Sequence, residues 1–208
     1  MNPEQNEIRM FDFDIRAEQN DEHGHHLTGR PIVFGVRTDL GWYDEIIDQG
    51  ALDGTDLKDV RFLVNHNTDM IPLARSRNNN AKSTMQMEVD AQGMTIRVDL
   101  DTENNADARS LYSAVDRGDI SGMSFMFRVD KDSWDDIDTD HPTRHIRSFR
   151  KVFEVSAVTF PAYEQTSISA RGLSDALESA RASLESERAE KREIERKKQR
   201  IKILTEVM

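Results

Sequence analysis

Short stretches in which apolar and polar side chains alternate recur along the first 160 residues, and turn-forming residues separate them. Around Ser124, for example, Met123, Phe125 and Phe127 alternate with Ser124 and Met126. A period of two places successive side chains on opposite faces of a strand. We therefore predict a mainly β fold of about seven strands with peripheral helices, an α+β protein built as a mostly antiparallel barrel or sandwich. The expected strands cover residues 8–15, 31–36, 60–65, 84–89, 94–100, 123–129, 145–152 and 153–160.

Two segments of the body have a helical pattern instead. In 102–117, apolar side chains recur from Ala108 to Val115 at the spacing i, i+3, i+4, i+7, which is typical of an amphipathic helix. Asp101 or Thr102 is in the right place to cap its start. A shorter helix is expected over 42–47.

The composition changes sharply after Gly172, where glycine and proline disappear and Ala, Glu, Lys, Arg and Leu dominate. Such a composition favours one long helix. Leu177, Ala180 and Leu184 keep an apolar seam, and charged residues interrupt it further along, so we interpret 173–208 as a weak coiled coil or partner-binding helix. The predicted organisation is a body over 1–172, with its core in about 29–170, followed by this tail.

The net charge of the body indicates which class of partner it can bind. The chain carries a net charge of -11, and residues 173–208 hold nine Lys/Arg and eight Asp/Glu, so the first 172 residues carry -11 minus +1, or -12. An acidic body repels phosphate and anionic membranes, so we expect a polypeptide partner, with no nucleic acid and no membrane. The absence of cysteine excludes disulfides and a thiol nucleophile. With no signal pattern and no long apolar run, we expect a soluble, cytoplasmic protein.

Three residues stand out as candidates for catalysis. His66 follows the apolar strand RFLVN, Ser124 lies in GDISGMSFMF, and Glu154 interrupts the nearly apolar run VFEVSAVTF. Taken singly, each has an ordinary explanation as a surface histidine, a cross-strand hydroxyl or a structural salt bridge. Together they could supply a base, a nucleophile and an orienting carboxylate.

The order of the motifs gives these residues a family context. The succession IVFGV…GWYDEIIDQGAL, FLVNHN…PLAR, GDISGMSFMF and FEVSAVTFPAY, from about Gly29 to Ala170, resembles the prohead serine proteases of tailed bacteriophages. The resemblance implies a closed antiparallel barrel similar to that of the herpesvirus assembly proteases. It also implies His66 as general base, Ser124 as nucleophile and Glu154 as the orienting acid.

The same resemblance implies a biological setting. The protein would be a serine endopeptidase that cleaves major capsid and scaffold proteins, and itself, inside the prohead in the host cytoplasm. We expect no cofactor and no metal. We also expect a homo-oligomer, for example a dimer. The alternatives are a non-enzymatic scaffold protein that binds the shell through its helical tail, and a small-ester hydrolase. The absence of a Gly-x-Ser-x-Gly elbow weakens the latter.

Several details of the site stay open. Met126 and Ala74 stand where these proteases usually have glycine, which affects backbone geometry near the site. The oxyanion would be bound by backbone N–H groups, with Arg75 or Arg77 as weaker candidates, because an ordinary role as solvated turn charges is favoured for both. Ser121 is the competing nucleophile.

Histidines outside the motif offer two rival sites. The cluster of His23, His25 and His26 looks like a metal site, but no further ligand lies at useful spacing, so we predict no metal there. His141 or His145 could replace Glu154 as third member of the triad. Both lie in or beside the polar segment WDDIDTDHPTRH, which is typical of a surface loop, so Glu154 is preferred.

Overall fold

The computed structural model of the chain describes residues 6–11, 15–20, 24–159 and 167–206, and it confirms a mainly β protein with two helices in these residues. The elements, in chain order, are β1 (Glu7–Phe11), β2 (Ile15–Asn20), β3 (Gly24–Val33), β4 (Arg37–Asp39), β5 (Asp44–Ile47), β6 (Asp59–Val64), β7 (Ala74–Arg77), β8 (Met85–Asp90), β9 (Gly93–Asp99), α1 (Ala106–Asp116), β10 (Gly122–Asp135), β11 (Thr143–Val158) and α2 (Ser167–Glu206).

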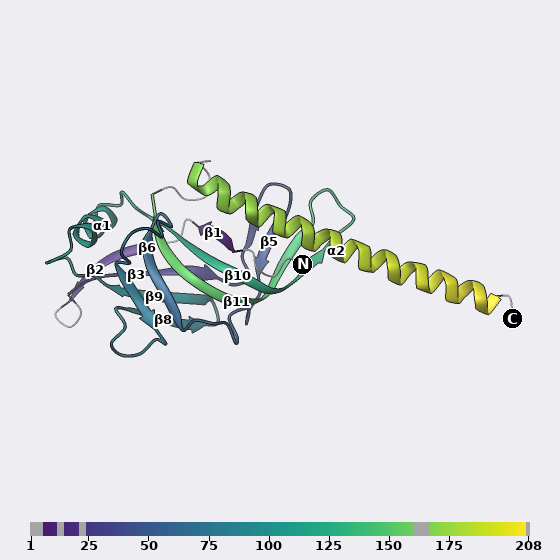
Figure 1. The fold of residues 1–208 in the computed structure, drawn as a ribbon, viewed down its shortest axis with the longest axis horizontal. Coiled ribbons are helices and arrows are strands. Elements are labelled where there is room, and N and C mark those ends of the chain that lie inside the picture. Colours follow the sequence, from purple (N-terminus) through teal and green to yellow (C-terminus); the bar gives the residue numbers. More distant parts are fainter. Residues whose placement is uncertain (1–5, 12–14, 21–23, 160–166, 207–208) are drawn as a thin grey trace.

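The strands form two sheets (Figure 1). The larger has seven strands in the order β1-β10-β11-β5-β4, with β6 and β7 joined through a second pairing of β11, and the smaller has four in the order β2-β3-β9-β8. Most pairings are antiparallel as predicted, but β11 pairs in parallel with both β5 and β6. Neither sheet closes on itself within the described residues, so the predicted closed barrel is not found there.

Strand β11 organises the larger sheet. Its 16 residues replace the two extended segments predicted for this region. Residues 143–146 pair with β5, and residues 154–157 pair with β6. The same edge of β11 is therefore paired with two different strands, one near each of its ends. The helix predicted over 42–47 is wrong, because Asp44–Ile47 is strand β5, in which Glu45 and Ile47 are buried and alternate with less buried neighbours.

One apolar core joins the two sheets. It combines Phe125 and Phe127 of β10 and Phe149 of β11 with methionine, isoleucine and valine side chains of β8 and β9. The rings of Phe127 and Phe149 lie 4.9 Å apart in an edge-to-face arrangement. Burying several large aromatic side chains in this way fixes the position of β10, the strand that carries Ser124.

Helix α1 begins later than predicted. Its cap is Asn105, whose side-chain oxygen accepts hydrogen bonds from the backbone N–H groups of Asp107 and Ala108 at 2.9 and 3.3 Å. Asp101 is used differently, because its carboxylate accepts the backbone N–H of Asn104. The preceding turn therefore supplies its own asparagine cap, which ranks with aspartate as the best residue for this position.

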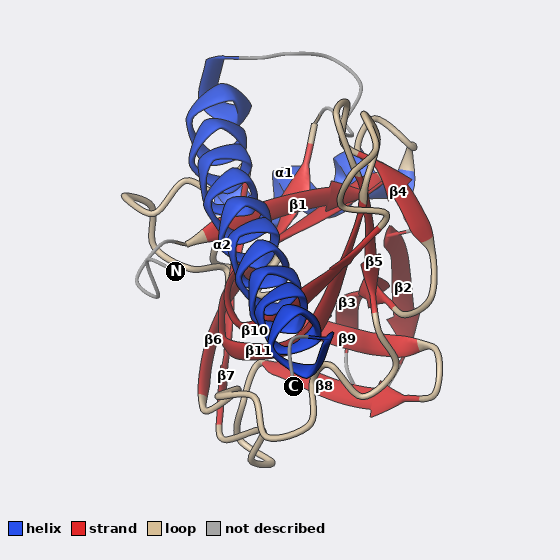
Figure 2. Ribbon diagram, turned by 90° about the vertical axis from the view of Figure 1, so that its right-hand side faces the viewer, coloured by secondary structure: helices blue, strands red, loops and turns tan. Residues whose placement is uncertain are grey.

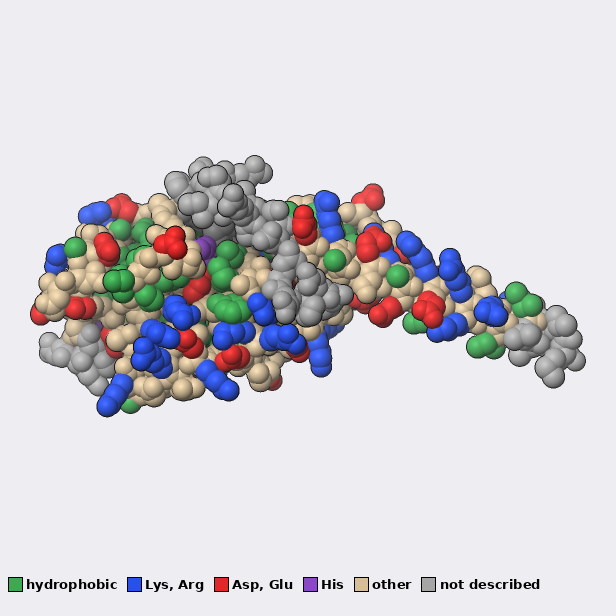
Figure 3. Space-filling model, viewed as in Figure 1, with side chains coloured by type: hydrophobic (Ala, Val, Ile, Leu, Met, Phe, Trp, Pro, Cys, Tyr) green, Lys and Arg blue, Asp and Glu red, His purple; other side chains and the backbone are tan. Residues whose placement is uncertain are grey.

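Helix α2 crosses the larger sheet and then extends beyond the body (Figures 1 and 2). Ala180 and Leu184 are buried against Tyr43 and Trp134, so the predicted apolar seam does pack, although against its own sheet. Past residue 190 the described side chains of the helix are exposed, and the projecting part displays both acidic and basic groups (Figure 3). No helix in the described residues is long and apolar enough to cross a membrane.

Candidate active site

The three residues predicted to form a triad come from two neighbouring strands and from the turn that follows a third. Strand β11 lies between β6 and β10, and the register places Ser124 of β10 directly opposite Ser156 of β11. Glu154 precedes Ser156 by two residues and therefore lies on the same face of the strand. His66 follows the end of β6, which pairs with this same part of β11.

The backbone before His66 turns sharply. Asn65 and His66 have φ angles of 51° and 55°, the left-handed region that non-glycine residues adopt rarely. Hydrogen bonds hold this turn: the Asn65 side-chain oxygen accepts the backbone N–H of Thr159 at 3.0 Å, and the backbone N–H of His66 donates to Ser156 Oγ at 3.2 Å. Specific contacts thus hold two adjacent residues in a costly conformation, and this turn sets the position of the His66 side chain.

The imidazole of His66 bridges the other two residues. Its Nε2 lies 2.5 Å from Ser124 Oγ, and its Nδ1 lies 2.5 Å from Glu154 Oε1. A neutral imidazole that donates from Nδ1 to a carboxylate keeps Nε2 free to accept a proton from a hydroxyl. The structure thus brings Ser124, His66 and Glu154 into the hydrogen-bonded order that activates a serine hydroxyl.

The carboxylate of Glu154 is nearly fully buried, with its side chain 3% exposed. Its second oxygen accepts a hydrogen bond from Ser156 Oγ at 2.6 Å. Both oxygens therefore have partners, which a buried carboxylate needs if it is not to destabilise the fold. Ser156 was missed from the sequence, although its parity with Glu154 within an otherwise apolar run was a usable signal.

The hydroxyl of Ser124 has a second neighbour that the sequence did not indicate. Its Oγ donates to the backbone carbonyl oxygen of Arg9 at 2.8 Å. Arg9 belongs to β1, which pairs antiparallel with β10 and places Met10 opposite Ser124. Ser124 is fully buried as a result.

A group of charged side chains anchors β1, and we call it the buried ion cluster. Its members are Glu7, Arg9, Glu45, Asp132 and Arg144, and their side chains are at most 3% exposed. Arg9 binds both oxygens of Glu45 at 2.5 and 2.6 Å and one of Glu7 at 2.7 Å. Arg144 binds Glu7 at 2.8 Å and Asp132 at 2.7 Å.

Two opposing effects set the pKa values in the cluster: burial disfavours the charged form of each group, and neighbouring opposite charges favour it. Burial by itself would lower the pKa of Arg9, but Glu45, Tyr43 and Glu7 outweigh it and hold that pKa above its ordinary value. Burial would raise the pKa of Glu7, yet Arg144 and Arg9 hold it below its ordinary value of 4.5. Burial raises the pKa of Tyr43 to about 12. Glu7 and Arg9, and Arg144, whose pKa the neighbouring carboxylates likewise hold above its ordinary value, are thus expected to be charged near neutral pH.

The other candidates for the reaction lie apart from the triad hydrogen bonds. Ser121 is exposed just before β10. The Arg75 guanidinium binds both oxygens of Asp59 at 2.6 and 2.7 Å. Arg75 and Arg77 line an open cavity of about 620 Å³ that includes Thr84 and none of the triad residues.

The remaining histidines have partners of their own. His25 lies 2.7 Å from Thr102 Oγ1, His26 lies 3.5 Å from a Glu18 oxygen, and His23 is outside the described residues. His145 contacts Asp48 at 2.8 Å. None of these contacts reaches the triad.

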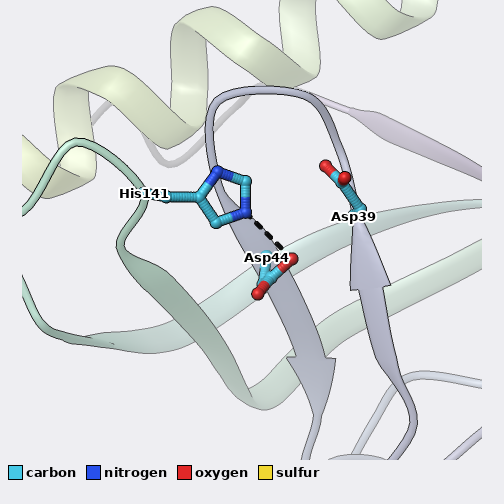
Figure 4. Close-up of side chains that lie close together, drawn as sticks. All are labelled: Asp39, Asp44 and His141. Atoms are coloured by element: carbon cyan, nitrogen blue, oxygen red, sulfur yellow. Dashed lines mark hydrogen bonds and ion pairs between the residues drawn. The ribbon is translucent and has the colours of Figure 1, made fainter.

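His141 lies with two carboxylates near the β4–β5 turn (Figure 4). Its Nε2 is 3.1 Å from Asp44 Oδ1, and Asp39 is the third member of this group. Asp44 is also paired with Arg37 at 2.7 Å, so its charge is already balanced. We interpret the group as surface ion pairs that fasten the segment before β11.

The two departures from the glycine pattern are accommodated by the backbone. Met126 lies in β10 immediately before a register irregularity, and Ala74 is the first residue of β7, opposite Phe62. Neither has a positive φ angle, so neither position requires glycine for its conformation.

A family model described as caudovirus prohead serine protease matches residues 11–179. The chain belongs to this family. Among curated proteins it is similar to the prohead protease of Enterobacteria phage HK97, with 36% identity over 92 residues. That alignment covers 44% of this chain and 39% of the relative, so the chain spans well under half of the relative's length. No solved structure matches this chain.

The range matched by the prohead protease family includes all three triad residues and ends within α2. Most of β1, including Glu7 and Arg9, precedes it. The similarity to the family therefore covers the segments that carry Ser124, His66 and Glu154. It does not extend to most of the strand that covers Ser124.

Proposed function

We propose that this prohead protease family member is a serine endopeptidase in which Ser124 is the nucleophile, His66 the general base and Glu154 the orienting acid. The observation that carries the proposal is the position of one imidazole between a hydroxyl and a carboxylate, at 2.5 Å from each. Ser124 and Glu154 come from two strands and His66 from the turn after a third, so their convergence is a property of the fold.

The chemistry follows in two steps. In the first, His66 Nε2 accepts the Ser124 proton as Oγ bonds to the scissile carbonyl carbon, and the resulting imidazolium then protonates the leaving amine as the C–N bond breaks. In the second, water loses a proton to His66 and attacks the acyl-enzyme, and the proton returns to Ser124 Oγ as the acid product leaves. Glu154 keeps the Nδ1 proton in place and stabilises the imidazolium.

Ser156 is a positioning residue in this mechanism. It donates to Glu154 and accepts from the backbone N–H of His66, so it couples the carboxylate to the turn that carries the base. We assign the oxyanion to backbone N–H donors, as is usual for acyl transfer. Arg75 and Arg77 remain weaker candidates for this role, because Asp59 already engages the Arg75 side chain.

Capsid and scaffold proteins are the proposed substrates, and the prohead inside the host cell is the proposed place of action. The named relative is a prohead protease, which supports this setting. We also propose that the chain cleaves itself, removing the tail over 173–208, and that it forms a homo-oligomer such as a dimer. Intact-mass spectrometry of the purified chain over time tests self-cleavage; a tail that stays attached while substrate is cleaved would exclude it.

The non-enzymatic scaffold alternative is not favoured. A protein that only binds shell subunits has no need for a buried hydroxyl, imidazole and carboxylate in hydrogen-bonded sequence. The exposed end of α2, with Ile194, Ile201 and Ile203 at 52–62% exposure, does offer apolar contacts to a partner. We propose partner binding as an additional role of the tail.

The direct experiment is co-expression with the shell protein encoded alongside this chain, read by gel and intact mass. Wild type should cleave the shell protein, and Ser124→Ala should abolish cleavage, a loss of about 10⁴-fold or more. Ser121→Ala is the matched control, because it removes an exposed hydroxyl three residues away, and it should retain activity. Cleavage that survives in Ser124→Ala but not in Ser121→Ala would overturn the assignment.

A further inference from the structure

Strand β1 lies where an extended peptide would have to lie to reach Ser124. It pairs antiparallel with β10 over Glu7 to Phe11, opposite residues 123–127. Because Ser124 is fully buried beneath this pairing, no scissile bond can approach its hydroxyl while β1 is in place. Peptides commonly bind by adding a strand to a sheet edge, and removal of β1 would expose such an edge on β10.

The backbone of β1 also imitates the reacting group. The carbonyl oxygen of Arg9 lies 2.8 Å from Ser124 Oγ, so Arg9 occupies the position of the residue whose carbonyl is attacked. Here the hydroxyl meets the carbonyl oxygen through a hydrogen bond, whereas attack requires approach to the carbonyl carbon. The strand is therefore held in an arrangement that is close to that of a substrate but unreactive.

The same contact interferes with the base. Ser124 has a single hydroxyl proton, and two acceptors compete for it: His66 Nε2 at 2.5 Å and the Arg9 carbonyl at 2.8 Å. When the proton points to Arg9, His66 cannot remove it. Displacement of β1 frees the proton for His66.

The side chain of Arg9 identifies what the vacated position would prefer. Its guanidinium binds both oxygens of Glu45, a residue of β5 that stays in the body when β1 leaves. Of the cluster members that stay, Glu45 and Asp132 are acidic and Arg144 is basic, so acidic groups outnumber basic ones there as they do when β1 is in place. What changes is that Glu45 loses the guanidinium of Arg9, which binds both of its oxygens. The hydroxyl of Tyr43 is buried there without a hydrogen-bond partner among the described side chains, so it offers one more acceptor.

We propose that the edge of β10 now occupied by β1 is the substrate-binding site, and that Glu45 selects an arginine or lysine at the residue whose carbonyl is cleaved. Strand β1 is then a resident competitor that must be displaced before catalysis. This inference rests on the proposed function. It adds the position of the substrate strand, the class of its key side chain and the reason the described state is closed.

The first experiment measures access to Ser124 in the full chain. A fluorophosphonate probe acylates an accessible, activated serine, and intact mass gives the rate. Arg9→Ala removes the anchor of β1 and should be labelled faster than wild type by about tenfold or more, because the rate scales with the open fraction. Arg9→Lys keeps the charge but loses the two-oxygen contact with Glu45, so its rate should lie between those of wild type and Arg9→Ala. Arg150→Ala, an exposed arginine of β11, is the matched control and should not change the rate.

Glu7→Gln gives a second route should Arg9→Ala fail to fold. It removes one partner of Arg9 and Arg144 while keeping the size of the side chain, so labelling should again accelerate, though less than in Arg9→Ala. Labelling of wild type, Arg9→Ala and Glu7→Gln at one common rate would overturn the proposed cover by β1. It would leave the serine protease assignment standing.

The second experiment measures selectivity with fluorogenic peptides that differ only at the residue whose carbonyl is cleaved. Wild type should prefer arginine over the uncharged norleucine by about tenfold or more, as expected of a close buried charge pair. In Glu45→Gln the arginine preference should fall towards unity while cleavage of the norleucine peptide rises, because β1 also loses its anchor. Glu103→Gln, an exposed carboxylate before α1, should match wild type.

The outcomes separate the two proposals. A full arginine preference in Glu45→Gln would overturn the assigned selectivity. Folded variants that are neither labelled at Ser124 nor able to cleave any peptide, Arg9→Ala included, would overturn the protease itself and this inference with it. A purely structural role of Glu45 would change both peptides by the same factor, and that result would also contradict the proposal.

Discussion

The triad contains Ser124, whereas the buried ion cluster holds β1, the strand that covers Ser124. The two groups are built from different parts of the chain. His66 and Glu154 belong to central elements of the larger sheet, and their contacts are short hydrogen bonds among two neighbouring strands and the turn after a third. The ion cluster ties an edge strand, β1, to the sheet through charges drawn from residues 7 to 144. We propose that the first arrangement performs the chemistry and that the second decides whether substrate can reach it.

Helix α2 is connected to the second of these regions through its described side chains. Ser183 of α2 donates to Asp132 at 2.9 Å and accepts from Trp134 Nε1 at 3.1 Å, and Asp132 binds Arg144 of the ion cluster. The helix also packs against β1. Helix α2 and the ion cluster therefore both contact β1, the strand that covers Ser124. Substitutions in the cluster should change the position of β1 without replacing a triad residue.

The largest expected effect separates chemistry from stability. Glu154→Gln keeps the size of the side chain but cannot hold the imidazole with Nε2 free, so peptide hydrolysis should fall by about 10⁴-fold. Steady-state kinetics of the full chain measures it, with Glu103→Gln as an unaffected control. Near-normal kcat in a folded Glu154→Gln variant would mean that the carboxylate is structural only.

The next effect falls on the ion cluster. Arg144→Met leaves Glu7, Glu45 and Asp132 with one buried cation, so the free energy of unfolding should drop by about 3–5 kcal/mol. Urea unfolding followed by circular dichroism measures the change. Arg150→Met, on the exposed side of the same strand, should change it by no more than about 0.5 kcal/mol. Equal stability of the two variants would show that the cluster does not hold the cover in place.

Ser156→Ala should have an intermediate effect on the triad. Loss of the hydrogen bond to Glu154 leaves one carboxylate oxygen buried without its partner, which should lower the free energy of unfolding by about 1–3 kcal/mol. Because Glu154 and the turn of His66 are then held less firmly, kcat should also fall, by roughly 10- to 100-fold. KM should change little, and the pH profile of kcat should shift, which a merely structural role would not produce. Ser121→Ala serves as the control for loss of a nearby hydroxyl.

The smallest expected effect is a pH dependence of the stability that the Glu7 carboxylate contributes to the folded chain. Glu7 faces Arg9 on β1, Arg144 on β11 and Glu45 on β5, and its pKa is lowered in the folded chain. A lowered folded pKa gives stability that is present above the ordinary value of 4.5 and is lost as pH falls through the folded value. The stability difference between wild type and Glu7→Gln should therefore shrink as pH falls below 4.5. A difference that is constant with pH would contradict this contribution.

Sequence reasoning singled out Ser124, His66 and Glu154 because their motifs follow one another in an order that resembles a known family, although each residue alone has an ordinary explanation. His66 ended a strand, Ser124 lay in an alternating segment and Glu154 interrupted an apolar run, and the order of motifs joined them. The members of the ion cluster gave no such signal. Glu7, Arg9 and Arg144 look like ordinary surface charges in the sequence, and only the pairing of β1 with β10 buries them.

The errors in the predicted fold have related physical causes. The segment 42–47 is a strand that does not show the usual alternation of apolar and polar residues, because the charged Glu45 falls on the buried face of β5. The predicted barrel required pairing between sheet edges, which local alternation does not specify. The cap of α1 was misplaced because Asp101 and Asn105 are both good capping residues, and only the turn between them decides which is used.

The central claim is that His66 activates Ser124 for nucleophilic attack. The most direct measurement is peptide mapping of the full chain after reaction with a fluorophosphonate, in the Arg9→Ala background and in the same background with His66→Ala. We predict one adduct, on Ser124, that is lost when His66 is replaced. An adduct on Ser121, or one on Ser124 that forms equally fast without the imidazole, would contradict the claim.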